Sequence, residues 1–203
     1  MTDIRGNKIS MIFQNPLTSL NPVFSVGEQI AMVLRRHRKL GKKEAMKEAQ
    51  RLMEMVSIPG ERFNDYPVQF SGGMRQRIGI AAGLACNTEL LIADEPTTAL
   101  DVTIQAQVLM LLKELQKKEN TALLMITHNL GIVSELCEKV AVMYGGQIIE
   151  YGLVQEVFAN PAHPYTVGLL GSLPKLTGPR DELYSIPGTV ANPQHLPSGC
   201  YFH

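Results

Sequence analysis

The sequence has little of what marks a secreted or a nucleic-acid-binding protein. It contains three cysteines among 203 residues, Cys86, Cys137 and Cys200, and no two of them form a C-x-x-C pair. Such spacing fits a reducing compartment better than a disulfide framework. Nineteen Lys and Arg residues balance nineteen Asp and Glu residues, so the chain has no net charge that would attract nucleic acid. We therefore expect no nucleic-acid partner.

Long apolar runs are also missing. No stretch approaches the apolar length needed to cross a bilayer, and the chain opens without a basic and then apolar leader. Any role at a membrane is therefore expected to come through a partner. The densest run of charge, RRHRKLGKK at residues 35–43, leads into a segment with helical spacing of apolar residues. This pattern favours an exposed helix end over a nucleic-acid site, and contact with lipid headgroups is the alternative.

What the sequence does contain is the pattern of an α/β protein. With 45% hydrophobic residues, the 203-residue chain is long enough for one domain and a small appendage. Two nearly continuous apolar runs, at residues 89–94 and 121–127, are separated by the helical pattern DVTIQAQVLMLLKELQKK. Such runs are typical of buried strands in a parallel sheet. A third run, at residues 8–13, predicts a further strand that leads into a loop.

Other segments predict helices, a hairpin and an irregular end. Residues 25–57 have the apolar spacing of helices, and another helix is expected after Ser71. The run at residues 139–144 is followed by two glycines and then by QIIEYG, which predicts a β-hairpin. From residue 160 onward prolines are concentrated and long apolar runs are few. We interpret residues 160–203 as an irregular C-terminal extension.

Polar side chains stand where the predicted strands end. Asp94 and Glu95 follow the apolar run LLIA, and packing alone does not explain them, since an unpaired buried charge is costly. At the carboxyl edge of a parallel sheet, one acid can hold Mg²⁺ and the next can orient a water, with a chance arrangement as the alternative. Gln14 follows the first strand, where a neutral amide can ligate a metal or a water. His128 follows a later strand, in a catalytic or a structural role.

The stretch SGGMRQ, at residues 71–76, stands at the start of a predicted helix. Ser71 can cap this helix, and Gly72 and Gly73 let the backbone approach an anion closely. Exposed amide groups and the helix dipole can then meet a phosphate. By itself the signal is weak, because a plain helix cap followed by glycines has the same sequence.

Taken together, in order and spacing, these motifs resemble those of the ATP-binding subunit of an ABC transporter. The matching motifs are Gln14 in a Q-loop, FSGGMRQR as the signature, LLIADEP as Walker B, TALD with Asp101 as the D-loop, and His128 as the switch histidine. IFQNPLTSLNP and the tail segments NPAHPYTVGLLGSLP, IPG and PSGC are similar to the dipeptide and oligopeptide import branch of that family. The resemblance covers essentially the whole chain.

The resemblance implies a P-loop NTPase fold with a RecA-like core. The core would comprise residues 1–14 and 86–159, the helical signature subdomain residues 15–85, and the C-terminal extension residues 160–203. The core would be incomplete at its N-terminus, because the phosphate loop G-x-x-x-x-G-K-[ST] is absent and only MTDIRGNKISMIF precedes Gln14. We expect the sequence to be a fragment. The alternative is a half-competent or non-catalytic subunit that supplies only its signature to a partner.

The resemblance also implies the chemistry of the site, with ATP and Mg²⁺ as ligands. Asp94 and Gln14 would bind Mg²⁺. Glu95 would polarise the attacking water, and His128 would contact the γ-phosphate. Four residues of the signature would bind the nucleotide held by a second subunit: Ser71, Gly72, Gly73 and Gln76. Asp101 would couple the two nucleotide sites.

The partners follow from the same resemblance. Two ATP-binding subunits, identical or different, would pair head to tail, and the helical subdomain would dock on membrane permease subunits at the cytoplasmic face of the cell membrane. A peptide-binding protein would take part indirectly. Without a phosphate loop, the chain alone is expected to bind ATP poorly and to leave apolar sheet surface uncovered. Cys200 resembles the first cysteine of an iron–sulfur site in some relatives, but the others do not follow it, so no cluster is expected.

These features predict an ATP-binding and ATP-hydrolysing subunit that couples hydrolysis to the import of dipeptides or oligopeptides. A non-transport ATPase of the same superfamily, such as a DNA-repair or translation factor, would predict a long coiled-coil insert or strong basic charge, and the sequence has neither. A module that binds a permease without turnover is the third possibility.

Overall fold

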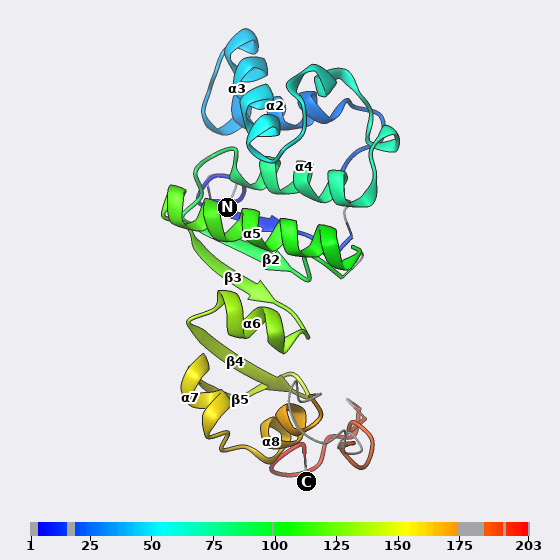
Figure 1. Cartoon of the computed structure of the whole chain (residues 1–203), viewed down its shortest axis with the longest axis vertical. Coiled ribbons are helices and arrows are strands. Elements are labelled where there is room, and N and C mark those ends of the chain that lie inside the picture. Colours follow the sequence, from blue (N-terminus) through cyan, green and yellow to red (C-terminus); the bar gives the residue numbers. More distant parts are fainter. Residues whose placement is uncertain (1–3, 16–18, 99, 174–184, 193, 203) are drawn as a thin grey trace. The chain divides into compact units, whose positions relative to one another are not determined.

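The chain divides into two compact units, Met1–His128 and Asn129–His203 (Figure 1). The computed structural model describes residues 4–15, 19–98, 100–173, 185–192 and 194–202. None of the helices within these ranges combines the length and the apolar character needed to cross a membrane. The subdomain boundaries expected after residues 14, 85 and 159 stay predictions, because the division into two units follows compactness alone.

The first unit is built on a three-stranded parallel sheet. In spatial order its strands are β1 (Ile9–Ile12), β2 (Leu90–Asp94) and β3 (Ala122–Ile126). Asp94, the last residue of β2, lies opposite Ile126, the last residue of β3. All three strands are short and mainly apolar, as is typical of parallel strands. The parallel sheet predicted from the sequence is confirmed.

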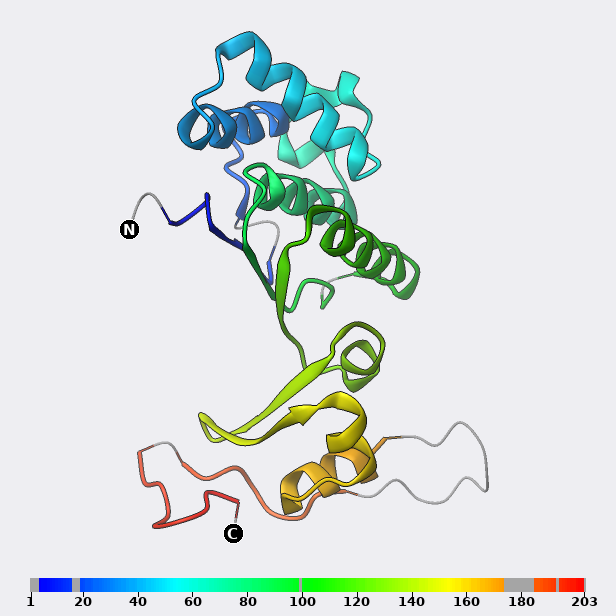
Figure 2. The same cartoon turned by 90° about the vertical axis from the view of Figure 1, so that its left-hand side faces the viewer.

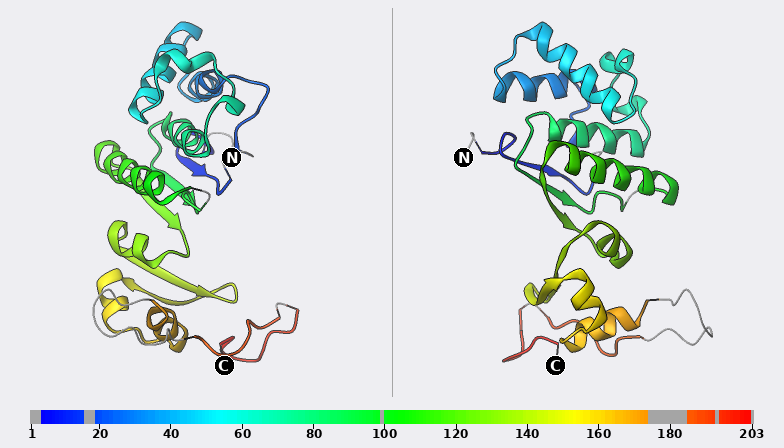
Figure 3. Two further views of the ribbon diagram at one scale, coloured as in Figure 1. Left: turned by 45° about the vertical axis from the view of Figure 1, so that its right-hand side comes forward. Right: turned by 60° about the vertical axis from the view of Figure 1, so that its left-hand side comes forward.

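The two faces of this sheet differ. α4 (Gly72–Leu84) and α5 (Val102–Glu119) cover one face, on which Leu91 is buried (Figure 3). On the opposite face Leu124 is 51% exposed and Ile126 is 47% exposed. Successive side chains of a strand point to opposite faces, so the exposed apolar residues share one side of the sheet. Apolar sheet surface is therefore uncovered in this chain, as the sequence led us to expect.

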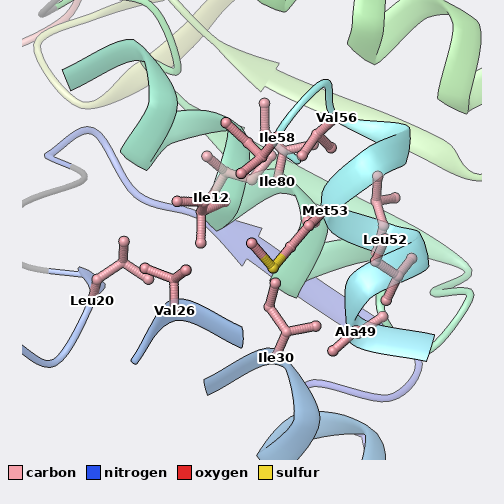
Figure 4. Close-up of a cluster of buried hydrophobic side chains, with 14 of the residues drawn as sticks. Ile12, Leu20, Val26, Ile30, Ala49, Leu52, Met53, Val56, Ile58 and Ile80 are labelled. Carbon is pink, nitrogen blue, oxygen red and sulfur yellow. The ribbon is translucent and has the colours of Figure 1, made fainter. Parts of the chain in front are cut away.

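A layer of helices packs beyond α4. α2 (Val26–His37) starts at Ser25, whose hydroxyl accepts the N–H of Glu28 at 3.3 Å, and a short turn connects it to α3 (Lys42–Met55). Two short 3₁₀ turns, η1 (Gly60–Asn64) and η2 (Pro67–Gln69), lead on to α4. Fully buried side chains of this layer, including Ile30, Met53 and Ile58, share one core with Ile80 of α4 (Figure 4). The helices predicted over residues 25–57 are confirmed.

The second unit contains α6 (Leu130–Leu136) followed by a two-stranded antiparallel hairpin. β4 (Lys139–Tyr144) pairs with β5 (Gln147–Leu153), and Gly145 and Gly146 form the turn with φ of +55° and +83°. Two positive φ angles in a two-residue hairpin turn require glycine or a residue that tolerates the left-handed region. The hairpin predicted from the glycine pair is confirmed.

The C-terminal extension is less irregular than the sequence predicts. α7 (Val154–Ala159) ends just before the extension, and within the extension lies the helix α8 (Pro164–Gly171). His163 begins α8, where its Nδ1 accepts the N–H of Tyr165 at 3.1 Å. The rings of Tyr165 and Phe202 pack edge to face at 5.4 Å. Proline is favourable at the first position of a helix, so the many prolines of this region did not exclude one.

Candidate functional site

Residues at the ends of all three parallel strands meet at one edge of the sheet. Gln14 lies two residues after β1, Asp94 and Glu95 lie at the end of β2, and His128 lies two residues after β3. Because parallel strands end at the same edge, residues far apart in the sequence come together there. This is the edge at which ligands bind in open α/β sheets.

Glu95 is the centre of the hydrogen bonds at this edge. The amide nitrogen of Gln14 donates to Glu95 Oε2 at 2.5 Å, and the hydroxyl of Thr98 donates to the same oxygen at 2.9 Å. His128 Nδ1 lies 3.1 Å from Glu95 Oε1. The structure therefore brings together Gln14, Glu95 and His128, which the sequence singled out. Thr98 was missed, because no pattern in the sequence specifies a hydrogen bond between its hydroxyl and the Glu95 carboxylate.

The backbone at Glu95 is in an uncommon conformation. Its φ is +42°, in the left-handed region that residues other than glycine seldom adopt. The N–H of Glu95 donates to the carbonyl of Ile126 at 2.9 Å, and the N–H of Thr98 donates to the carbonyl of Glu95 at 3.3 Å. These bonds hold the chain where it leaves β2. They fix the backbone from which the Glu95 side chain extends.

The hydrogen bonds around Glu95 favour its ionised form. The Thr98 hydroxyl and the His128 ring lower the pKa of Glu95, desolvation opposes them, and the Gln14 amide adds to the lowering. The carboxylate is therefore charged at neutral pH and is held by three neighbours. A fixed, ionised carboxylate at a ligand-binding edge can orient a water molecule and accept its proton.

Asp94 and Gln14 have the chemistry that Mg²⁺ requires. Asp94 supplies carboxylate oxygens, and Gln14 donates through its nitrogen, which leaves its amide oxygen as a ligand. Mg²⁺ prefers oxygen ligands and is often bound by one or two protein groups together with substrate phosphates and waters. The described residues contain no group of three or more His, Cys, Asp and Glu side chains placed to hold a metal. The oxygens of Asp94 and Gln14 therefore fit a Mg²⁺ ion whose other ligands are phosphate oxygens and waters.

The start of α4 is open beside its first residue, Gly72. Ser71 caps the helix, its hydroxyl accepting the N–H of Met74 at 3.4 Å. A Cβ atom on Gly72 would meet nothing within 4 Å, so the space beside this first turn is open. Unpaired N–H groups and the positive end of the helix dipole make such a terminus suited to an anion. The predicted capping role of Ser71 is confirmed.

Gln76 and Asp101 occupy different surroundings. Gln76 lies one turn further along α4 and is only 2% exposed, and its amide nitrogen has no hydrogen-bond partner among the described residues. Asp101 caps α5, with its Oδ1 accepting the N–H of Ile104 at 3.0 Å. Within the described part of the chain, no hydrogen bond joins Ser71 or Asp101 to Glu95. The nucleotide roles of these residues stay predictions.

Known families and proteins match this chain along its length. The family model described as "ABC transporter" matches residues 1–98, and the one described as "Oligopeptide/dipeptide transporter, C-terminal region" matches residues 149–203. The chain is 56% identical to "Oligopeptide transport ATP-binding protein AppD" of Bacillus subtilis, over 98% of this chain and 61% of the relative. It is 55% identical to "Dipeptide transport ATP-binding protein DppD" of Lactococcus lactis, over 98% of this chain and 58% of the relative.

Solved structures give the same result. The dimeric structure of the ABC transporter cassette MJ0796 aligns with a TM-score of 0.66 at 28% identity, over 75% of this chain and 66% of that one. The structure of cbiO1 from Clostridium perfringens, part of the ABC transporter complex cbiONQ, aligns with a TM-score of 0.66 at 30% identity, over 75% of this chain and 59% of that one. The chain thus has the P-loop NTPase fold of these cassettes and spans about 60% of the length of the curated relatives. It belongs to the family of ABC transporter ATP-binding proteins, in the branch whose members carry the oligopeptide and dipeptide transporter C-terminal region.

Proposed function

We propose that the chain is an ATP-hydrolysing subunit of an ABC importer and couples hydrolysis to the uptake of oligopeptides or dipeptides. The proposal is carried by the convergence of Gln14, Thr98 and His128 on the Glu95 carboxylate at the sheet edge. The identity of more than half of its residues to proteins named for oligopeptide and dipeptide transport supports the substrate class.

Glu95 acts on the water that attacks the γ-phosphate. Its ionised carboxylate orients that water and draws a proton from it as the new phosphorus–oxygen bond forms, while the bond to the leaving ADP oxygen breaks. Thr98 and Gln14 keep the carboxylate in place. His128 meets Glu95 through Nδ1, and its side chain is 72% exposed, so Nε2 is accessible to a γ-phosphate oxygen.

Two further groups hold the nucleotide. Asp94 and the amide oxygen of Gln14 would bind Mg²⁺, and neutralisation of phosphate charge is what that ion would supply. Ser71, Gly72 and Gly73 would present the N-terminus of α4 to ATP bound by a second ATP-binding subunit, and Asp101 would couple the two sites. Permease subunits would hold the assembly at the cytoplasmic face of the membrane, and a peptide-binding protein would deliver the substrate.

The test replaces Glu95 by Gln in the intact transporter from the native host, reconstituted in vesicles. Because Gln keeps the shape and removes the base, we expect peptide-dependent ATP hydrolysis to fall 10²- to 10⁴-fold, while ATP binding persists. Glu89→Gln is the matched control, since Glu89 precedes the same strand and its side chain forms an exposed ion pair with Lys8 at 3.1 Å. It should leave the rate unchanged.

Two results would overturn this assignment. Equal hydrolysis by the Glu95→Gln transporter and the native one would remove Glu95 from the reaction. If a change at the start of α4 abolishes hydrolysis while Glu95→Gln has no effect, the chain supplies only its signature motif to a partner subunit.

A further inference from the structure

Positive charge is concentrated at the corner between α2 and α3, although the net charge of the whole chain is zero. Residues 35–51 contain eight Lys or Arg residues and two Glu residues, a net charge of +6, which the rest of the chain offsets. Six of the eight cations fall within residues 35–43. These nine positions comprise the last turn of α2, the connecting turn and the first turn of α3.

The two acidic residues of this segment are already engaged. Glu48 binds Arg38 at 3.2 Å and Arg51 at 2.8 Å. The carboxylate of Glu44 accepts the N–H of Gly41 at 3.3 Å. Within the described part of the chain, no ion pair is formed by the six remaining cations, Arg35, Arg36, Lys39, Lys42, Lys43 and Lys47. Their charge is therefore directed to solvent.

The same corner offers no apolar anchor. Leu40 and Met46 pack against the core, and none of the exposed large hydrophobic side chains of the described residues falls between residues 25 and 65. A surface of this kind attracts an anionic layer without inserting into it. Binding of that type weakens steeply with salt, because the charges are solvated and screened within about 10 Å at 0.1 M.

The basic corner belongs to a different part of the unit from the Glu95 cluster. α2 and α3 form an outer layer, and α4 lies between that layer and the sheet (Figures 1 and 2). Glu95 lies at the end of β2 in the sheet itself. A partner at the corner would therefore leave the sheet edge open.

We propose that residues 35–43 form a surface that binds the phosphate groups of anionic lipid headgroups. The inference rests on the proposed function, because a subunit of an importer works beside a membrane. A cluster of four to eight Lys and Arg residues next to a bilayer is attracted to its negative surface, and each charge strengthens partitioning about fivefold. A nucleic acid is the less favoured occupant, because an extended polyanion would also meet the net acidic remainder of the chain.

The experiment is co-sedimentation of the full chain with vesicles, without ATP or permease, so that its outcome does not depend on hydrolysis. Vesicles of phosphatidylcholine containing 30 mol% phosphatidylglycerol are compared with phosphatidylcholine alone. We expect binding to the anionic vesicles only, and its loss at about 0.5 M salt, where the screening length shrinks to a few ångströms.

Two double variants test which charges are responsible. Lys42→Gln with Lys43→Gln should weaken binding roughly 25-fold, about fivefold for each charge. Lys117→Gln with Lys118→Gln removes the same charge from the last turn of α5 and should change binding little. Circular dichroism of both variants separates a folding defect from a binding defect.

Three results would overturn the inference. Equal binding to neutral vesicles, persisting in high salt, would assign the binding to the exposed apolar sheet face. Equal weakening by both double variants would assign it to overall charge. Tighter binding of a duplex oligonucleotide than of vesicles, lost in the Lys42 and Lys43 variant, would make the corner a nucleic-acid site. A normal hydrolysis rate in the assembled transporter with any of these results would leave the proposed function intact.

Discussion

Gly73 of α4 and Ile104 of α5 are in such close contact that no larger residue fits at position 73. A Cβ atom on Gly73 would lie 2.4 Å from Cγ2 of Ile104, well inside the 3.0 Å below which real contacts essentially never fall. Ile104 also donates its N–H to the capping carboxylate of Asp101. The start of α4 and the start of α5, both predicted to act on nucleotide, are thus joined through Ile104.

Replacing Gly73 by Ala should destabilise the fold. The added methyl group meets a β-branched side chain that is stiff at χ1, and overpacking of this kind costs about 1–3 kcal/mol. Gly72→Ala is the matched control, because a Cβ at that position meets nothing within 4 Å. The free energy of unfolding, measured by urea titration, should fall for Gly73→Ala and stay level or rise slightly for Gly72→Ala.

The clash can be relieved from the other side. Adding Ile104→Ala to Gly73→Ala removes the atom that the new methyl group meets, so the double variant should lose less stability than the two single variants together. Strictly additive losses would show that the contact between α4 and α5 is not what limits position 73.

Part of the site follows from the sequence because strand order and strand ends are encoded locally. The apolar runs before Asp94 and His128 predict parallel strands, and such strands must end at one edge, so the meeting of Gln14, Glu95 and His128 could be expected. The pairing of β1 with β2 across some eighty residues is a tertiary contact that no local pattern specifies. It was implied only by the resemblance to a family.

Three features of the structure could not be predicted from the sequence pattern. The left-handed backbone of Glu95 and its bond to Thr98 depend on how the chain turns after β2, which nothing in LLIADEPTT specifies. Gly73 was interpreted as leaving room for an anion, yet its surroundings add a second reason for glycine, the approach of Ile104. α8 was not predicted, because proline at a helix start has the same sequence as proline in a loop.

Gly72→Asp should separate stability from nucleotide binding. A negative charge in the first turn of α4 interacts favourably with the helix dipole, typically by about 0.3–1 kcal/mol, and the position is open. The unfolding free energy should therefore hold or rise. The same charge repels a phosphate, so ATP hydrolysis by the assembled transporter should be lost.

Gly72→Asn is the control for this change. Asn has nearly the same shape as Asp without the charge, so it should keep substantially more hydrolysis. If both variants hydrolyse ATP like the native chain, the start of α4 does not meet a phosphate.

Thr98→Val should change the pH dependence of hydrolysis. The hydrogen bond from the Thr98 hydroxyl makes the largest contribution to the lowered pKa of Glu95. Removal of this hydroxyl therefore raises the pKa toward its ordinary value. Glu95 must be ionised to act, and activity is lost as the pH falls through its pKa. The acid limb of kcat/KM should therefore move to higher pH.

Thr98→Ser keeps the hydroxyl and should retain the native acid limb. Because the shift is a change in the position of the limb, it differs from a general loss of activity through misfolding. Coincident acid limbs for Thr98→Val and the native chain would mean that the hydroxyl does not act on the Glu95 carboxylate.

Asp101 has a structural role, because it caps α5. The family resemblance implies a second role, the coupling of two nucleotide sites, and two substitutions can separate the roles. Asp101→Ala removes the oxygen that accepts the N–H of Ile104, and loss of such a cap costs about 0.5–2 kcal/mol. Asp101→Asn caps a helix as well as Asp does, so its unfolding free energy should match that of the native chain. If the carboxylate also couples two nucleotide sites, Asp101→Asn should lower the hydrolysis rate of the assembled transporter despite full stability. A native hydrolysis rate in the Asn variant would mean that Asp101 has a structural role alone. It would cap the start of α5 and so keep Ile104 in its position against Gly73.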